Sequence, residues 1–132
     1  MTAFPSLEWM TELKNTLNND KEFKKASQWF MGSIALEFGD TYQYWLEISR
    51  GSILDVQEGE NVFGVTFTIS GPIDDWKGLI TDQEPGLAKL TTETPEFKCG
   101  NLAFKGNIVE AIRNFKMLWI MTQDMRNIDT EF

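Results

Sequence analysis

The sequence predicts an α+β fold in a single domain spanning residues 1–132. Three observations lead to this prediction. Apolar residues recur with the 3.6-residue period of a helix at both ends of the chain, and with the two-residue period of a strand between them. Turn residues, chiefly Gly, Asn and Asp, separate the periodic segments, and no linker or repeat interrupts them. A chain of 132 residues with 42% apolar residues can also bury one sizeable core without disulfides or metal.

Two helices are predicted before the first strand. The first has an apolar stripe with helical spacing, made of Trp9, Met10, Leu13 and Leu17. Ser6 precedes this stripe at the position of a helix cap. Asn19 and Glu22 have the spacing of a capping box, which predicts a short second helix that runs through Ala26.

Four consecutive strands are predicted over residues 33–38, 42–48, 53–56 and 65–69, separated by glycine-containing turns. Each strand has one apolar and one polar face, which predicts a sheet covered on one side only. Trp45 is an exception because it falls on the polar face beside Gln43, Glu47 and Ser49. A ring of that size needs cover there from a helix or a partner.

The remaining elements alternate between helix and strand. Gly71-Pro72 predicts the start of a helix over residues 73–80, because proline is favoured at the first helical position. Residues 81–95 read as a loop that holds at most two turns of helix around Leu87 and Leu90. A fifth strand is predicted over residues 97–105. Asn107 and Glu110 then have the capping-box spacing that begins a last helix.

The last helix carries two apolar stripes. The first consists of Ile108, Ala111, Ile112, Phe115, Leu118 and Trp119, and the second of Met117, Met121 and Met125. The methionines are explained by core filling or a dimer seam, or else by a wall that adapts to ligands of varied shape. One sheet face does not need this much apolar surface. A partner, a cavity or the loop over residues 81–95 must therefore cover the remainder.

Composition excludes most catalytic chemistry. The chain has no His, which is the usual base in general acid-base catalysis and in catalytic triads and a usual ligand of zinc. Cys99 has no second cysteine to pair with and no His to activate it, which favours an inert buried thiol. Asp74 and Asp75 are explained by the favourable charge at a helix start. No motif for nucleotide, metal or acyl chemistry occurs, so we expect no enzyme, cofactor or metal.

The net charge of −8 opposes binding to nucleic acid or to anionic membranes. The longest apolar run, over residues 117–121, is too short to span a bilayer, so no stable membrane insertion is expected. The first residues do not have the pattern of a secretory signal. These features predict a cytoplasmic protein.

Several segments together resemble a known family. The segment Gly100–Asn107, a strand that runs into an Asn-capped helix, is similar to the corresponding segment of the sterol carrier protein 2 (SCP2) domain. Upstream, the segments 44–48, 66–69 and 76–80 follow in the order that this family shows. The chain departs from the family at Gly64, in the spacing of the loop over residues 84–95, and in its acidity.

The resemblance implies a five-stranded mixed, largely antiparallel sheet with helices packed on one face, and a lipid-binding tunnel between them. It also implies a non-catalytic carrier of fatty acids, acyl-CoAs, sterols or similar lipids. The residues expected to line the tunnel are Leu46, Phe67, Trp76, Leu79, Leu87, Leu90, Leu102, Phe104, Phe115, Trp119 and Met121.

Two other functions stay open. The domain could be an interaction module, in which the methionine stripe and Trp45 meet another chain and form a homodimer. A small cofactor-free isomerase would need a carboxylate inside the tunnel together with Tyr42 or Tyr44. The strand pattern places Glu37, Glu47 and Asp55 on the polar face instead.

Overall fold

The computed structural model describes residues 2–61, 64–81, 90–91, 98–99 and 102–131. The helices are α1 (Leu7–Asn18), α2 (Lys21–Ala26), α3 (Ile73–Ile80), α4 (Ile108–Arg113) and α5 (Phe115–Met125). The strands are β1 (Thr2–Ala3), β2 (Met31–Phe38), β3 (Tyr42–Ser49), β4 (Ser52–Glu58), β5 (Phe67–Gly71), β6 (Leu90–Thr91), β7 (Lys98–Cys99), β8 (Leu102–Gly106) and β9 (Thr130–Glu131).

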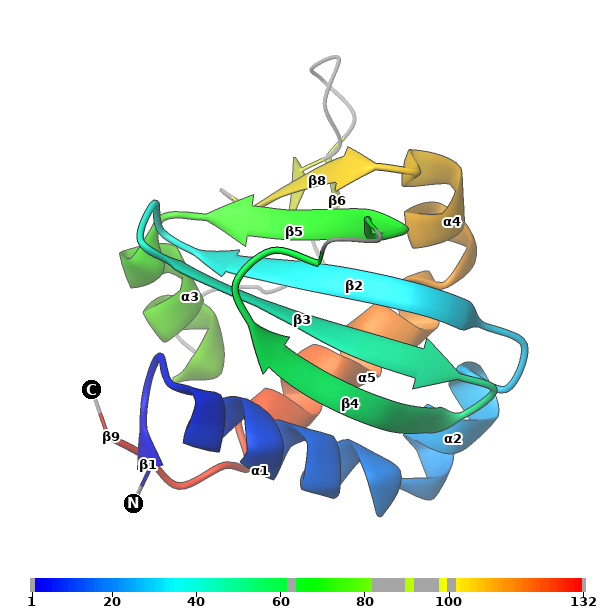
Figure 1. Cartoon of the computed structure of the whole chain (residues 1–132), viewed down its shortest axis with the longest axis horizontal. Helices are drawn as coiled ribbons and strands as arrows, with labels where there is room; N and C mark the ends of the chain where they lie inside the picture. Colours follow the sequence, from blue (N-terminus) through cyan, green and yellow to red (C-terminus); the bar gives the residue numbers. More distant parts are fainter. Residues whose placement is uncertain (1, 62–63, 82–89, 92–97, 100–101, 132) are drawn as a thin grey trace.

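The main sheet has the strand order β4-β3-β2-β5-β8-β7-β6 (Figure 1). Strands β2, β3 and β4 form an antiparallel meander, whereas β5 returns to pair in parallel with β2. Strand β8 then pairs antiparallel with β5. Because β6 and β7 have two residues each, the sheet consists mainly of five strands. The α+β class and the five-stranded mixed, largely antiparallel sheet are therefore confirmed.

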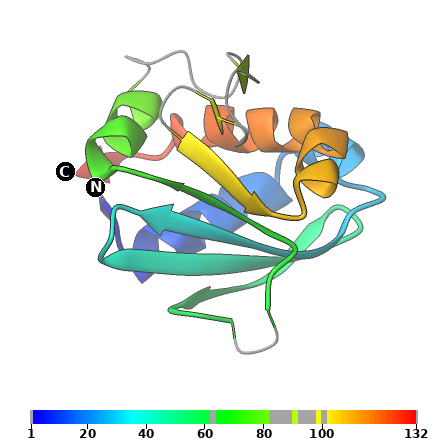
Figure 2. The same cartoon turned by 90° about the horizontal axis from the view of Figure 1, so that it is seen from above.

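Helices α3, α4 and α5 lie on one side of this sheet, and the connection between β4 and β5 lies on the other (Figure 2). The alternation within each strand explains this layering. In β3, Tyr44, Leu46 and Ile48 are buried on the helical side, while Trp45 and Glu47 alternate with them on the outer face. The one-sided cover of the sheet is confirmed.

Aromatic contacts attach α3 and the N-terminal segment to the sheet. The ring of Phe38 packs edge-on against Trp76 and Phe4, with both centroid separations 4.8 Å. The indole nitrogen of Trp76 donates a hydrogen bond to the carbonyl oxygen of Glu37 at 2.9 Å. One hydrogen bond and one ring contact therefore fix α3 to the end of β2.

The two N-terminal helices form where the sequence predicts, with one difference at a cap. Ser6 caps α1 by accepting a hydrogen bond from the Trp9 amide, and the predicted stripe is fully buried. The cap of α2 is Asp20, which accepts from the amides of Glu22 and Phe23. The predicted Asn19–Glu22 capping box is wrong, because Asn19 closes the last turn of α1 instead.

The C-terminal half differs more from the sequence pattern. The last helix is capped by Asn107 as predicted, but it breaks at Asn114 into α4 and α5. The fifth strand predicted over residues 97–105 is instead two strands, β7 and β8, that pair antiparallel. Leu90 and Thr91, assigned to a loop with turns of helix, form strand β6. The strand predicted from residue 65 begins at Phe67, and Pro72 precedes α3 as its cap.

The two ends of the described chain lie next to each other (Figure 1). Strands β1 and β9 pair in parallel, with Thr2 opposite Thr130. The indole nitrogen of Trp9 donates a hydrogen bond to the Thr130 hydroxyl at 2.9 Å. The C-terminal segment is thus joined to α1 and to the start of the chain.

Candidate functional site

Six of the eleven residues expected to bind an apolar ligand converge on the space between the sheet and the helices. These six are at most 5% exposed and belong to one hydrophobic cluster: Leu46, Phe67, Trp76, Leu79, Phe104 and Met121. They come from β3, β5, β8, α3 and α5, so the fold brings together elements that are far apart in the sequence. Leu87 lies outside the described residues, as do the side chains of Leu90 and Leu102.

This described part of the interior is filled by its own side chains. Leu46, Phe67, Trp76 and Met121 have no surface that water can reach, either from outside or from an internal void. An apolar ligand that touched these four residues would first have to displace neighbouring side chains. Their role as a ligand-binding wall stays a prediction.

The methionine stripe fills the core, which is one of the two explanations left open for it, whereas the first stripe divides between the core, through Ala111 and Leu118, and the surface. Met117, Met121 and Met125 face the core and are at most 1% exposed. Ile112 and Trp119 are 46% and 40% exposed, and Phe115 is half-buried between them. We call Ile112, Phe115 and Trp119 the outer stripe. Five adjacent apolar residues over 117–121 left both faces apolar, so the pattern did not distinguish the two.

Asp124 is a buried carboxyl group on α5 that no sequence motif marks. It is 8% exposed, and its Oδ2 atom is buried without a hydrogen-bond partner. Burial, the hydrogen bond to Asp20, and the negative charges of Asp20 and Glu22 raise its pKa to about 7. The same hydrogen bond lowers the pKa of Asp20. The only signal in the sequence is spacing, since Asp124 lies three residues after Met121 on the buried face.

A cavity of about 620 Å³ lies on the outer face of the sheet. Its lining residues are Gly32, Ser33, Trp45, Glu47, Asn61, Gly64, Val65 and Thr66. Trp45 is half-buried there, so the ring lies on the polar face as predicted. The described residues that share the cavity with it come from β2, from β3 and from the connection between β4 and β5, and none of them belongs to a helix.

None of the helices in the described part of the chain has the length and apolar character needed to cross a membrane. No group of three or more Cys, Asp or Glu residues within that part is arranged to hold a metal ion.

Comparison with known proteins gives matches in structure only. No protein-family model matches the chain, and no curated protein matches its sequence. A crystal structure of sterol carrier protein 2 is similar with a TM-score of 0.72 and 19% identity, covering 92% of this chain and 95% of that one. A solution structure from Thermus thermophilus, described as possibly sterol carrier protein, has a TM-score of 0.73 and 17% identity, covering 96% and 90%.

A third solved structure, the SCP2 domain of the ubiquinone synthesis protein UbiJ, has a TM-score of 0.56 and 19% identity, and the match covers 96% of this chain and 97% of that one. In all three matches nine tenths or more of both chains are covered, so the similarity extends over the whole fold. The chain therefore has an SCP2-like fold.

Proposed function

We propose that this protein is a non-catalytic binding or carrier domain of the cytoplasm for an apolar ligand, such as a fatty acid, an acyl-CoA or a sterol. The SCP2-like fold supports this function, since two of the similar structures are described as a sterol carrier protein or possibly one. The observation that carries the proposal is the outer stripe. A helix with two apolar faces, one in the core and one exposed, has apolar surface left for a ligand.

The ligand is proposed to lie along α4 and α5 and to insert between these helices and the sheet. The core side of α5 there includes three methionines, whose flexible side chains can rearrange around an incoming chain. The outer stripe contributes Phe115 and Trp119, which a ligand can contact before any core residue moves. A ligand that enters beside α4 and α5 does not have to displace the fully buried side chains around Trp76.

The expected affinity is modest. Burying ~350 Å² of a long acyl chain contributes about 9 kcal/mol at ~25 cal/mol per Å². Association costs of at least ~4 kcal/mol, together with displacement of side chains, leave binding in the micromolar to millimolar range. A polar head group held elsewhere on the surface would tighten it.

Quenching of tryptophan emission by a brominated fatty acid tests the proposal, because bromine quenches only nearby rings. Trp119 belongs to the outer stripe, whereas Trp29 is 86% exposed in the segment between α2 and β2. We expect quenching in the delipidated wild type and in Trp29→Phe, and much weaker quenching in Trp119→Phe. Unchanged emission and melting temperature with fatty acids, acyl-CoAs and sterols alike would overturn the proposal.

A second candidate function is favoured by the same exposed residues. Ile112 and Trp119 could form the centre of a homodimer interface, since large exposed apolar side chains on one helical face also mark protein contacts. Light scattering over a concentration series separates the two functions. A monomer at all concentrations favours the ligand, and a dimer that Ile112→Glu dissociates favours the interface.

A further inference from the structure

The outer cavity has a floor and a wall from different parts of the chain. The floor is formed by β2, through Gly32 and Ser33, and by the outer face of β3, through Trp45 and Glu47. The wall is formed by Asn61, Gly64, Val65 and Thr66, which lie between β4 and β5. The wall residues belong to the connection that lies on the side of the sheet opposite to helices α3, α4 and α5 (Figure 2), so the sheet separates this cavity from those helices.

Hydrogen bonds hold the wall against the floor. The amide of Thr66 donates to the carbonyl oxygen of Ser33 at 2.8 Å, and the side-chain nitrogen of Asn61 donates to the Ser33 hydroxyl at 3.4 Å. The amide of Gly64 donates to the Asn61 carbonyl at 2.9 Å. Gly32 permits the close approach, because a Cβ atom there would lie 2.3 Å from the Thr66 hydroxyl. The wall is therefore attached to the floor at Ser33 through both Asn61 and Thr66.

The floor combines an aromatic face with a carboxylate. Trp45 and Glu47 are two residues apart on one strand, so both side chains project from the same face with Cα atoms about 7 Å apart. Tryptophan attracts cations over its ring more strongly than other aromatic residues do. Within the described chain, the Glu47 carboxylate forms no ion pair or hydrogen bond. A cation between the two groups would contact both.

The surrounding charges are also negative. Among the described residues that line the cavity there is no Lys or Arg. Asp55 lies opposite Glu47 in the pairing of β3 with β4, and Glu58 and Glu60 follow along the chain. A smaller outer-face cavity of about 290 Å³ includes Lys105 in its lining and so lacks this character.

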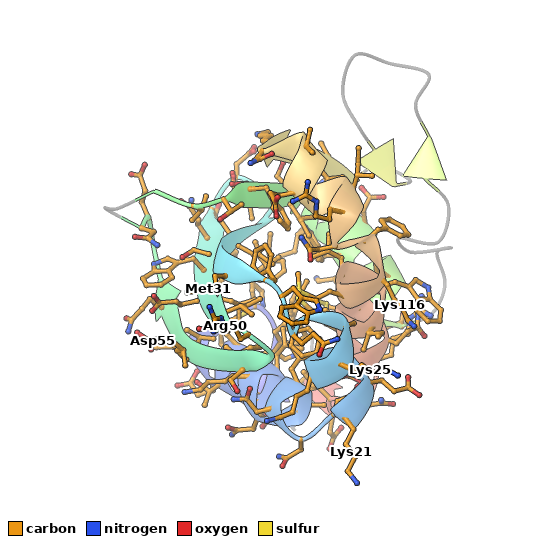
Figure 3. The ribbon with its side chains drawn as sticks, turned by 90° about the vertical axis from the view of Figure 1, so that its right-hand side faces the viewer. Lys21, Lys25, Met31, Arg50, Asp55 and Lys116 are labelled. Carbon is orange, nitrogen blue, oxygen red and sulfur yellow. The ribbon has the colours of Figure 1, made fainter. Side chains whose placement is uncertain are left out.

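The cations of the helical layer lie elsewhere. Figure 3 shows Asp55 on the outer side of the sheet, whereas Lys21 and Lys25 of α2 and Lys116 of α5 lie on the helical side. Arg50 is on the sheet side, in the turn three residues beyond Glu47, but it is not part of the lining. A protein of net charge −8 thus presents an aromatic cavity bordered by acids.

We propose that the outer cavity is a binding site for a small organic cation, such as an alkylammonium or quaternary ammonium group, held between the Trp45 ring and the Glu47 carboxylate. The hydroxyls of Ser33 and Thr66 and the Asn61 amide offer neutral acceptors for a polar group on the same ligand. The site is independent of the proposed apolar ligand, because the two occupy opposite faces of the sheet.

Choline and its neutral isostere 3,3-dimethyl-1-butanol test the site, because they differ in charge but hardly in shape. The indole N–H resonance of Trp45, assigned by its loss in Trp45→Leu, reports binding in a ¹H–¹⁵N NMR titration. We expect choline to shift this resonance in a saturable way, with an affinity that falls as salt is added. The neutral isostere is expected to shift it at least about 5-fold less effectively.

Glu47→Gln and Glu37→Gln form a matched pair of variants on the outer face. Glu47 is exposed, so its substitution leaves the fold intact, and of the two outer-face cavities among the described residues Glu37 lines the smaller one. We expect Glu47→Gln to weaken choline binding about 5-fold or more, and Glu37→Gln to leave it unchanged. Equal binding of the neutral isostere, no movement of the Trp45 resonance, or unaltered affinity in Glu47→Gln would each overturn the proposal.

Discussion

The carboxyl group of Asp124 keeps its proton to about pH 7, because burial and the neighbouring Asp20 carboxylate both disfavour its charged form. In the unfolded chain the same group loses its proton near 3.8, the ordinary pKa of an aspartate. Folding therefore favours proton uptake between these two values. The contribution of Asp124 to stability is fully present below the lower value and is lost as the pH rises to about 7. Asp20 acts in the opposite sense, since its lowered pKa gives stability that is lost on acidification.

The substitution Asp124→Asn tests this coupling, because asparagine retains a donor for Asp20 but cannot ionise. We expect the free energy of unfolding of the wild type to fall between about pH 4 and pH 7 relative to that of Asp124→Asn. The variant is expected to be the more stable protein at pH 8. Urea denaturation at pH 4.5 and pH 8 measures both differences, and parallel curves for the two proteins would contradict the assignment.

Met121 and Met31 form a second pair of residues with the same chemistry and opposite surroundings. Met121 is fully buried on α5, whereas Met31 is 62% exposed at the start of β2. Met121→Ala is expected to cost about 2–4 kcal/mol of the free energy of unfolding, because it leaves a cavity in a packed core. Met31→Ala is expected to change it by less than about 0.5 kcal/mol. Equal costs would show that the methionine stripe is not closely packed.

Among the elements, α1 could be predicted from the sequence and the face of α5 could not, for one physical reason. Helix α1 has one apolar stripe and a polar opposite side, so only one face can be buried. Helix α5 is apolar on both faces, and packing against the sheet and α2 decides between them. The split of residues 97–105 into β7 and β8 was missed because the alternation there is weak.

Gly106 ends β8 before the cap of α4, and its role can be separated from that of Gly59. Both glycines have positive φ, 96° and 94° respectively. A Cβ atom at Gly106 would lie 3.1 Å from the carbonyl oxygen of Thr66, whereas nothing lies within 4 Å at Gly59. Both Ala variants therefore share the backbone strain, of about 1 kcal/mol, and only Gly106→Ala adds crowding.

We expect Gly106→Ala to lower the melting temperature by several degrees more than Gly59→Ala does, since about 1 kcal/mol corresponds to that shift in a domain of this size. Differential scanning calorimetry measures the difference. Equal shifts would mean that α4 moves freely enough at this junction to relieve the contact with β5.

For the whole molecule, the sequence predicts the layers but not the order of strands. Alternation in a strand specifies which face is buried, not which strand lies beside it. The parallel pairing of β5 with β2, which creates the outer cavity, needs the connection after β4 to cross the sheet. Burial on the apolar face, in contrast, can be predicted from the sequence, and six of the predicted wall residues therefore meet in one cluster. Trp119 lies outside this cluster, because the sequence does not predict which face of α5 is buried.

The joining of the chain ends leads to a final prediction at this scale. The hydroxyl of Thr130 accepts from the indole nitrogen of the fully buried Trp9, so Thr130→Val leaves that donor without this partner. We expect a cost of about 1–3 kcal/mol in the free energy of unfolding. Thr11→Val, which removes an exposed hydroxyl bonded within α1, is the control and is expected to cost less than about 0.5 kcal/mol.

Removal of residues 129–132 then separates the strand pairing from this single hydrogen bond. It also removes the carbonyls of Asp129 and Glu131, which accept from the amides of Thr2 and Phe4 at 2.9 Å each. The truncated protein is expected to lose about 1–2 kcal/mol beyond the cost of Thr130→Val, since each such hydrogen bond contributes about 0.5–1.5 kcal/mol. If urea denaturation gives the same loss for both variants, the β1–β9 pairing contributes no stability, and Thr130 acts through Trp9 alone.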